Sequence, residues 1–147
     1  MDRLARLKAR EIVDVLCVHH WAGPILDVGG GAGAICRELI GAKKAVGQPV
    51  KATLFDLPEV IQAARQLYPE SGHWEAIRPV AGDFRHDDVG GRRGFGLVVL
   101  SNFLHAYNAR TAKRLLQKAA AMAAADGLVL IHDYFPDRRG VRPHKGT

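Results

Sequence analysis

One acidic residue and a run of glycines form the segment of this sequence best suited to binding chemistry. Asp27 lies in the apolar run 25–28, which reads Ile-Leu-Asp-Val. Four glycines follow it closely: Gly29, Gly30, Gly31 and Gly33. A strand, a glycine turn and a helix in this order bring the backbone close to a nucleotide-like ligand. Because a carboxylate at Asp27 would lie where a dinucleotide places its pyrophosphate, the turn favours a cationic ligand.

S-adenosylmethionine is a nucleotide-like molecule of this kind, since it carries an ammonium and a sulfonium but no phosphate. The sequence therefore predicts a methyl-donor site at the glycine turn. A nicotinamide cofactor is the alternative, because residues 29–34 also satisfy the spacing of the dinucleotide fingerprint. Asp56 would serve the ribose of either ligand.

Further polar residues fall at or just beyond the ends of predicted strands. They are Asp56, Asp83, Ser101, Asn102, His105 and Asp133. The carboxyl ends of parallel strands meet at one edge of a sheet, and ligands bind there. We therefore expect these side chains to share one rim with the glycine turn. For each acid, a helix cap or a turn residue is the alternative interpretation.

The elements that would hold this rim alternate regularly along the chain. Apolar runs predict strands at 25–28, 51–55, 78–81, 95–100 and 128–131. Helical patterns or signals predict helices at 3–18, 34–41, 58–68 and 108–125. This alternation predicts an α/β fold, a Rossmann-like doubly wound parallel sheet of about five strands. The expected division is an N-terminal helix and connector (1–23), a ligand-binding core (24–136) and a basic irregular tail (137–147).

Composition narrows the class of protein without deciding its function. The chain has 147 residues, 48% of them hydrophobic and 24% charged, as is ordinary for one globular domain. No apolar run is long enough for a membrane span and no signal peptide is visible, so a cytoplasmic location is the default expectation. The net charge of +6 is concentrated near the termini, which favours solvated ends or a docking surface over nucleic-acid binding. Two cysteines without a CxxC pair indicate idle thiols.

The ordered set of motifs resembles the class I S-adenosylmethionine-dependent methyltransferases. It is most similar to the small-molecule O-methyltransferases of plant phenolic and bacterial secondary metabolism. The matching segments are residues 26–33, 55–58, 82–84, 100–105 and 127–131. The resemblance implies that the glycines and Asp27 hold the methionine part and that Asp56, with Leu57 beside it, holds the ribose hydroxyls. It also implies that Asp83 and Phe84 hold the adenine, and that Ser101 and Asn102 line the methionine side.

The same resemblance assigns the chemical step to His105 as the general base that removes a proton from a phenolic hydroxyl. Ala106 and Tyr107 follow it here, whereas family members commonly have Asp and Trp. Where many members carry a supporting glutamate, this chain has His132 and Asp133, so Asp133 is expected to support the base. No clustered carboxylates suggest a metal site, and no metal is predicted.

Complete family members resemble a helical dimerisation domain followed by a seven-stranded catalytic domain. This sequence matches only the first five strands, so the last two strands and most of the helical domain are not represented. It is expected to be a fragment, a subunit completed by a homo- or hetero-oligomeric partner, or a degenerate remnant. The predicted function is methyl transfer to a small-molecule acceptor. A non-catalytic cofactor-binding or regulatory subunit is the alternative, and nucleic-acid methylation is disfavoured because no Asn-Pro-Pro-aromatic motif is present.

Overall fold

A computed structural model describes residues 2–67, 74–133, 135–136 and 143–144. Its main sheet has five strands in the order β3-β2-β1-β4-β5, and every neighbouring pair is parallel. The strands are β1 (Ile25–Val28), β2 (Ala52–Asp56), β3 (Ile77–Ala81), β4 (Phe95–Ser101) and β5 (Ala123–His132). The predicted α/β fold with a doubly wound parallel sheet is confirmed.

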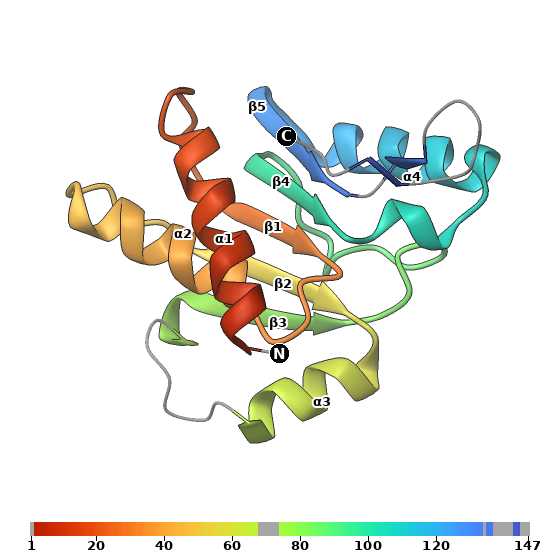
Figure 1. Ribbon diagram of the computed structural model, residues 1–147, viewed down its shortest axis with the longest axis horizontal. Helices are drawn as coiled ribbons and strands as arrows, with labels where there is room; N and C mark the ends of the chain where they lie inside the picture. The colour runs from red at the N-terminus through yellow and green to blue at the C-terminus, as the bar shows by residue number, and fades with distance from the viewer. Residues whose placement is uncertain (1, 68–73, 134, 137–142, 145–147) are drawn as a thin grey trace.

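Helices cover both faces of this sheet, as Figure 1 shows. The helices are α1 (Asp2–Leu16), α2 (Ala34–Ala45), α3 (Pro58–Leu67) and α4 (Ala109–Met122), with short 3-10 turns η1 (Trp74–Ala76) and η2 (Leu104–Ala106). One buried apolar cluster joins α1, α2 and α3 to the sheet, and a second joins α4 and the loop after β3 to the opposite face. Two buried layers hold the carboxyl ends of the strands in fixed positions.

The central strands are apolar on both faces because helices or loops cover both. All seven residues of β4 are buried, as the continuous apolar run 95–100 predicts. Close packing also dictates one glycine in this strand. A Cβ on Gly96 would lie 1.6 Å from the carbonyl oxygen of Ala22, so the connector after α1 passes directly against the strand.

The predicted end of the last helix was wrong. The alanine-rich sequence predicts a helix to residue 125, but α4 ends at Met122 and Ala123 has an extended backbone. Ala123 pairs with Phe95 at the start of β4, and the Met122 carbonyl accepts a hydrogen bond from Gly94 N. These tertiary contacts override the helix preference of alanine, which is the highest of any residue but is worth less than about 1 kcal/mol per residue.

The segment 137–147 was expected to be irregular, and the structure describes only Pro143–His144 of it. These two residues form β7, which pairs antiparallel with β6 (Phe135–Pro136) in a separate two-stranded sheet. The remainder of that segment lies outside the described residues.

Candidate functional site

The glycine turn after β1 is fastened to the end of β2. Gly29 N donates to the carbonyl oxygen of Phe55 at 2.7 Å, and Gly31 N donates to Asp56 Oδ2 at 2.9 Å. Gly29 has φ +71°, and a Cβ there would lie 2.9 Å from the Phe103 ring, so both conformation and space require glycine. The turn therefore presents bare backbone beside a carboxylate.

Asp27 lies underneath this turn instead of facing solvent. Its side chain is fully buried, Cys36 Sγ lies 3.3 Å from its Oδ2, and a Cβ on Gly30 would lie 2.5 Å from that same oxygen. Its Oδ1 has no hydrogen-bond partner among the described residues. Burial raises the pKa of Asp27 from 3.8 to about 7, more than the Cys36 hydrogen bond lowers it. The predicted contact of Asp27 with an ammonium group stays a prediction.

A pocket of about 280 Å³ opens beside the turn, at the carboxyl ends of the strands. Six of the predicted cofactor residues line it: Gly29, Asp56, Leu57, Asp83, Phe84 and Asn102. The other predicted residues, Asp27, Gly30, Gly31, Gly33 and Ser101, are not in its lining. Further lining residues that the sequence analysis missed are Val28, Phe55, Gly82, Arg85, Phe103, Ala106 and Tyr107.

Aromatic rings form much of the pocket wall, and most of them were not among the predicted site residues. Phe84 packs edge-on against Phe55 at 5.8 Å and against Phe103 at 6.0 Å between ring centroids. Phe103 in turn lies 5.3 Å from Tyr107. Phe103 and Tyr107 each stand two residues from His105, so aromatic residues on both sides of a predicted base were the signal that could have revealed them.

Asp83 enters the pocket together with an arginine. Arg85 Nη2 lies 2.7 Å from Asp83 Oδ2, and Arg85 N and Nε both donate to Asp83 Oδ1. The hydrogen bonds from the Arg85 side chain and backbone lower the pKa of Asp83 to about 2. An ionised carboxylate therefore lies at this end of the pocket across the physiological range.

His105 and Asp133 are brought together from segments 28 residues apart. Asp133 Oδ1 lies 2.7 Å from His105 Nδ1, while Asp133 Oδ2 accepts hydrogen bonds from the backbone N of Phe103, Leu104 and His105. The Asp133 side chain is fully buried and the His105 side chain is 48% exposed. Asp133 thus binds the first backbone N–H groups of η2 and contacts the imidazole at once, and its expected support of a catalytic base stays a prediction.

Ser101 and His132, which flank these residues in sequence, face elsewhere. Ser101 Oγ lies 3.5 Å from His132 Nδ1, and His132 Nε2 lies 3.8 Å from Glu11 on α1. Asn102 differs, since it lines the pocket with the left-handed φ of +51° and its Oδ1 is buried without a partner among the described residues. A strained residue with an orphaned acceptor is typical of a ligand-binding position.

Comparison with known proteins identifies the family of this chain. The family model of the O-methyltransferase domain matches residues 3–146. The chain belongs to the O-methyltransferase domain family. It is 33% identical over 117 residues to 3-amino-4-hydroxybenzoate 4-O-methyltransferase of Streptomyces cremeus and 31% identical over 142 residues to demethylspheroidene O-methyltransferase of Cereibacter sphaeroides.

These relatives are much longer than the matched segment. The matches cover 78% and 95% of this chain but only 30% and 34% of the two relatives. Among solved structures, the S-adenosylmethionine-dependent methyltransferase SibL superposes with a TM-score of 0.73 at 24% identity, covering 95% of this chain and 39% of SibL. Mitomycin 7-O-methyltransferase MmcR gives 0.71 at 23%, covering 90% of this chain and 38% of MmcR. These two likenesses support the fold.

The pocket of this O-methyltransferase domain fits the family's cofactor, S-adenosylmethionine. Gly29 presents backbone without a side chain in the lining, Asn102 Oδ1 is an acceptor with no partner among the described residues, and Asp56 and Asp83 add two carboxylates. These acceptor oxygens suit a ligand with hydroxyls, an amine and a positive charge. Among the residues that the structure describes, no three potential ligands cluster to hold a metal ion, and no helix is long and apolar enough to cross a membrane.

Proposed function

We propose that this domain catalyses S-adenosylmethionine-dependent methyl transfer to a hydroxyl group of a small, aromatic acceptor, with His105 as general base. The contact of His105 Nδ1 with Asp133 Oδ1 at 2.7 Å carries the proposal. A carboxylate at Asp133 accepts from Nδ1, which leaves the Nε2 lone pair for an acceptor hydroxyl. The half-exposed position of the imidazole gives that hydroxyl access.

The residues of the pocket would hold the cofactor in the following way. Asp56 would accept hydrogen bonds from the ribose hydroxyls, and Asp83 would accept one from the adenine amine while Phe84 packs on the ring. The turn at Gly29 and the Asn102 side chain would line the methionine part. When bound, S-adenosylmethionine supplies a methyl group already activated on a sulfonium.

The chain's own chemical work is then alignment and proton removal. A phenol with its ordinary pKa of about 10 is mostly protonated at neutral pH, so a base is needed as the oxygen becomes a nucleophile. Asp133 fixes the imidazole through one oxygen and fixes the backbone that carries it through the other. This double attachment gives the base a single orientation.

The acceptor class is proposed by likeness to the relatives. Their names specify 3-amino-4-hydroxybenzoate and demethylspheroidene, and that of a third relative, from Streptomyces carzinostaticus, specifies 2,7-dihydroxy-5-methyl-1-naphthoate. The 48% exposure of His105 leaves one side of the acceptor site to be covered by further residues, from the same polypeptide or from a partner subunit.

The test combines binding with methyl transfer. Calorimetry with S-adenosylhomocysteine and with NAD checks the cofactor class, and tight binding of NAD alone would contradict the proposal. With labelled S-adenosylmethionine and a panel of hydroxybenzoates, His105→Gln should lower the rate by roughly 10²–10⁴, the usual contribution of a general base. The exposed His19 gives a matched control in His19→Gln, which should keep the full rate.

Unchanged transfer by His105→Gln would refute the base assignment. Cofactor binding without any transfer by the wild-type protein, in its native assembly, would instead favour the non-catalytic subunit. Native mass spectrometry of the purified protein identifies that assembly before the assay.

A further inference from the structure

The turn that carries Asp83 and Phe84 into the pocket is a closed unit. His86 N and Asp87 N both donate to the carbonyl oxygen of Asp83, at 2.9 and 2.8 Å. The Asp87 side chain also contacts Asp83, because its Oδ2 accepts a hydrogen bond from Asp83 N at 2.8 Å. Main-chain and side-chain hydrogen bonds therefore close the same few residues into one turn.

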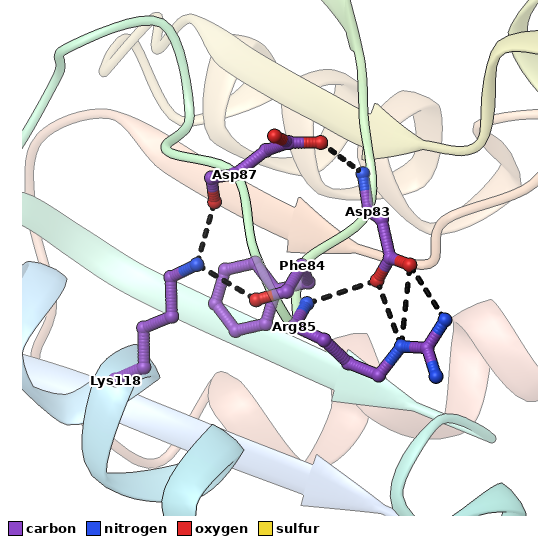
Figure 2. A network of polar contacts seen from close by, with 5 residues as sticks. All are labelled: Asp83, Phe84, Arg85, Asp87 and Lys118. Carbon is purple, nitrogen blue, oxygen red and sulfur yellow. Dashed lines mark hydrogen bonds and ion pairs between the residues drawn. The ribbon is translucent and has the colours of Figure 1, made fainter.

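One lysine from a distant helix connects this turn to the rest of the domain. Lys118 lies on α4, and its Nζ donates to the carbonyl oxygens of Phe84 at 2.7 Å and Asp87 at 2.5 Å. The same ammonium lies 4.5 Å from the centroid of the Phe84 ring. Figure 2 shows Lys118 reaching the turn from the side opposite the Asp83–Arg85 pair.

These contacts bear on the pocket because of what the turn presents to it. Phe84 is 3% exposed and packs on Phe55 and Phe103, so the position of its ring determines the shape of the aromatic wall of the pocket. Asp83 is covalently next to it, and both residues line the pocket. Lys118 itself does not line that pocket, so any influence on a ligand must act through the turn.

We propose that Lys118 is a positioning residue for the adenine end of the cofactor pocket. Its charge-assisted bonds to two carbonyls fix the height of the turn above the sheet, and its contact with the ring fixes the tilt of Phe84. Together they hold Asp83 and Phe84 at the spacing that an adenine ring requires. The inference rests on the proposed function, because it concerns the same pocket and the same cofactor.

The test compares Lys118→Met, which keeps the length of the stem and removes the ammonium, with two reference variants. Lys113→Met is the matched control, because Lys113 is an exposed lysine on the same helix. Asp87→Ala removes the side-chain hydrogen bond to Asp83 N but keeps the Asp87 carbonyl oxygen that Lys118 contacts. Calorimetry measures Kd for S-adenosylhomocysteine and, separately, for adenosine, which contains only the nucleoside half of the cofactor.

Lys118→Met and Asp87→Ala should both weaken binding of adenosine and S-adenosylhomocysteine by about tenfold, within the range of coupled contacts. Lys113→Met should bind as the wild type does, and Lys118→Arg should recover part of the loss. Faster amide hydrogen exchange at residues 83–87, at a temperature where circular dichroism is unchanged, should accompany the loss. This readout separates a loosened turn from general unfolding.

The outcomes separate the two proposals. If the wild type binds neither ligand, the proposed function fails and this inference fails with it. If the wild type binds and Lys118→Met binds equally well, the proposed cofactor site stands and the role of Lys118 is refuted. A lowered melting temperature with unchanged Kd for adenosine would likewise refute it, because Lys118 would then only stabilise the fold.

Discussion

Replacing Asp27 by Asn should remove a pH dependence that the wild-type protein carries in its stability. The Asp27 carboxyl is fully buried, and burial raises its pKa to about 7, against an ordinary value of 3.8. Between these values the folded protein holds a proton that the unfolded chain releases. The free energy of unfolding contributed by Asp27 is therefore greatest below about pH 4 and declines as the pH rises to about 7.

The size of the effect follows from the same two values. Each tenfold difference in proton affinity is worth about 1.36 kcal/mol, so the interval from 3.8 to about 7 corresponds to roughly 4 kcal/mol. Asn is uncharged throughout this range and makes no such contribution. Any constant cost of burying the Asn amide lowers the free energy of unfolding equally at every pH, so it does not change the slope of a plot of that free energy against pH.

Urea unfolding followed by circular dichroism between pH 4.5 and 8 measures this slope. The free energy of unfolding of Asp27→Asn relative to the wild type should rise with pH up to about 7 and level off above it. Asp14→Asn, at an exposed carboxylate on α1, controls for the loss of one acidic side chain. Parallel curves for the wild type and Asp27→Asn would refute the account, because they would show that the carboxyl titrates alike in the folded and unfolded chains.

Two further substitutions test the packing and the polar wall of the pocket. Gly96→Ala should lower the free energy of unfolding in urea by roughly 3 kcal/mol, since its Cβ would overlap the Ala22 carbonyl. Gly91→Ala is the control: its Cβ meets no atom within 4 Å, so it should cost only about 1–2 kcal/mol for its left-handed backbone. Equal costs for the two variants would contradict this explanation. Asp56→Asn should weaken S-adenosylhomocysteine binding about tenfold or more in calorimetry, because its amide nitrogen replaces one acceptor oxygen and then opposes either Gly31 N or Leu57 N. Glu59→Gln should leave Kd unchanged, and equal affinities for the wild type and Asp56→Asn would rule out a direct role for Asp56.

The arrangement of the strands was predictable because its signals are local. Apolar runs such as 95–100 predict buried strands, and the alternation with helices predicts a parallel sheet with its strand ends on one rim. The end of α4 was not predictable, because the pairing of Ala123 with Phe95 depends on a strand that lies far earlier in the chain. Of the aromatic wall only Phe84 was predicted; Phe55 and Phe103, which pack on it, were missed for a related reason, since they come from two other segments.

The direction in which each polar side chain points follows from the alternation of strand residues, a rule that the motif comparison did not apply. Successive side chains point to opposite faces, so Asp27 shares a face with Ile25, and His132 shares one with Leu130. That is the face covered by α1 and α2, where Asp27 contacts Cys36 and His132 lies near Glu11.

The same alternation sends the neighbouring residue to the face where the proposed chemistry takes place. Asp133 follows His132 by one position, so it points toward η2 and contacts His105. His132 and Asp133 are adjacent in the chain, yet His132 lies near Ser101 and Glu11, whereas the buried Asp133 contacts the proposed base. Strand period therefore gives a geometric reason for the sequence-based preference for Asp133 over His132 as the residue that supports the proposed base.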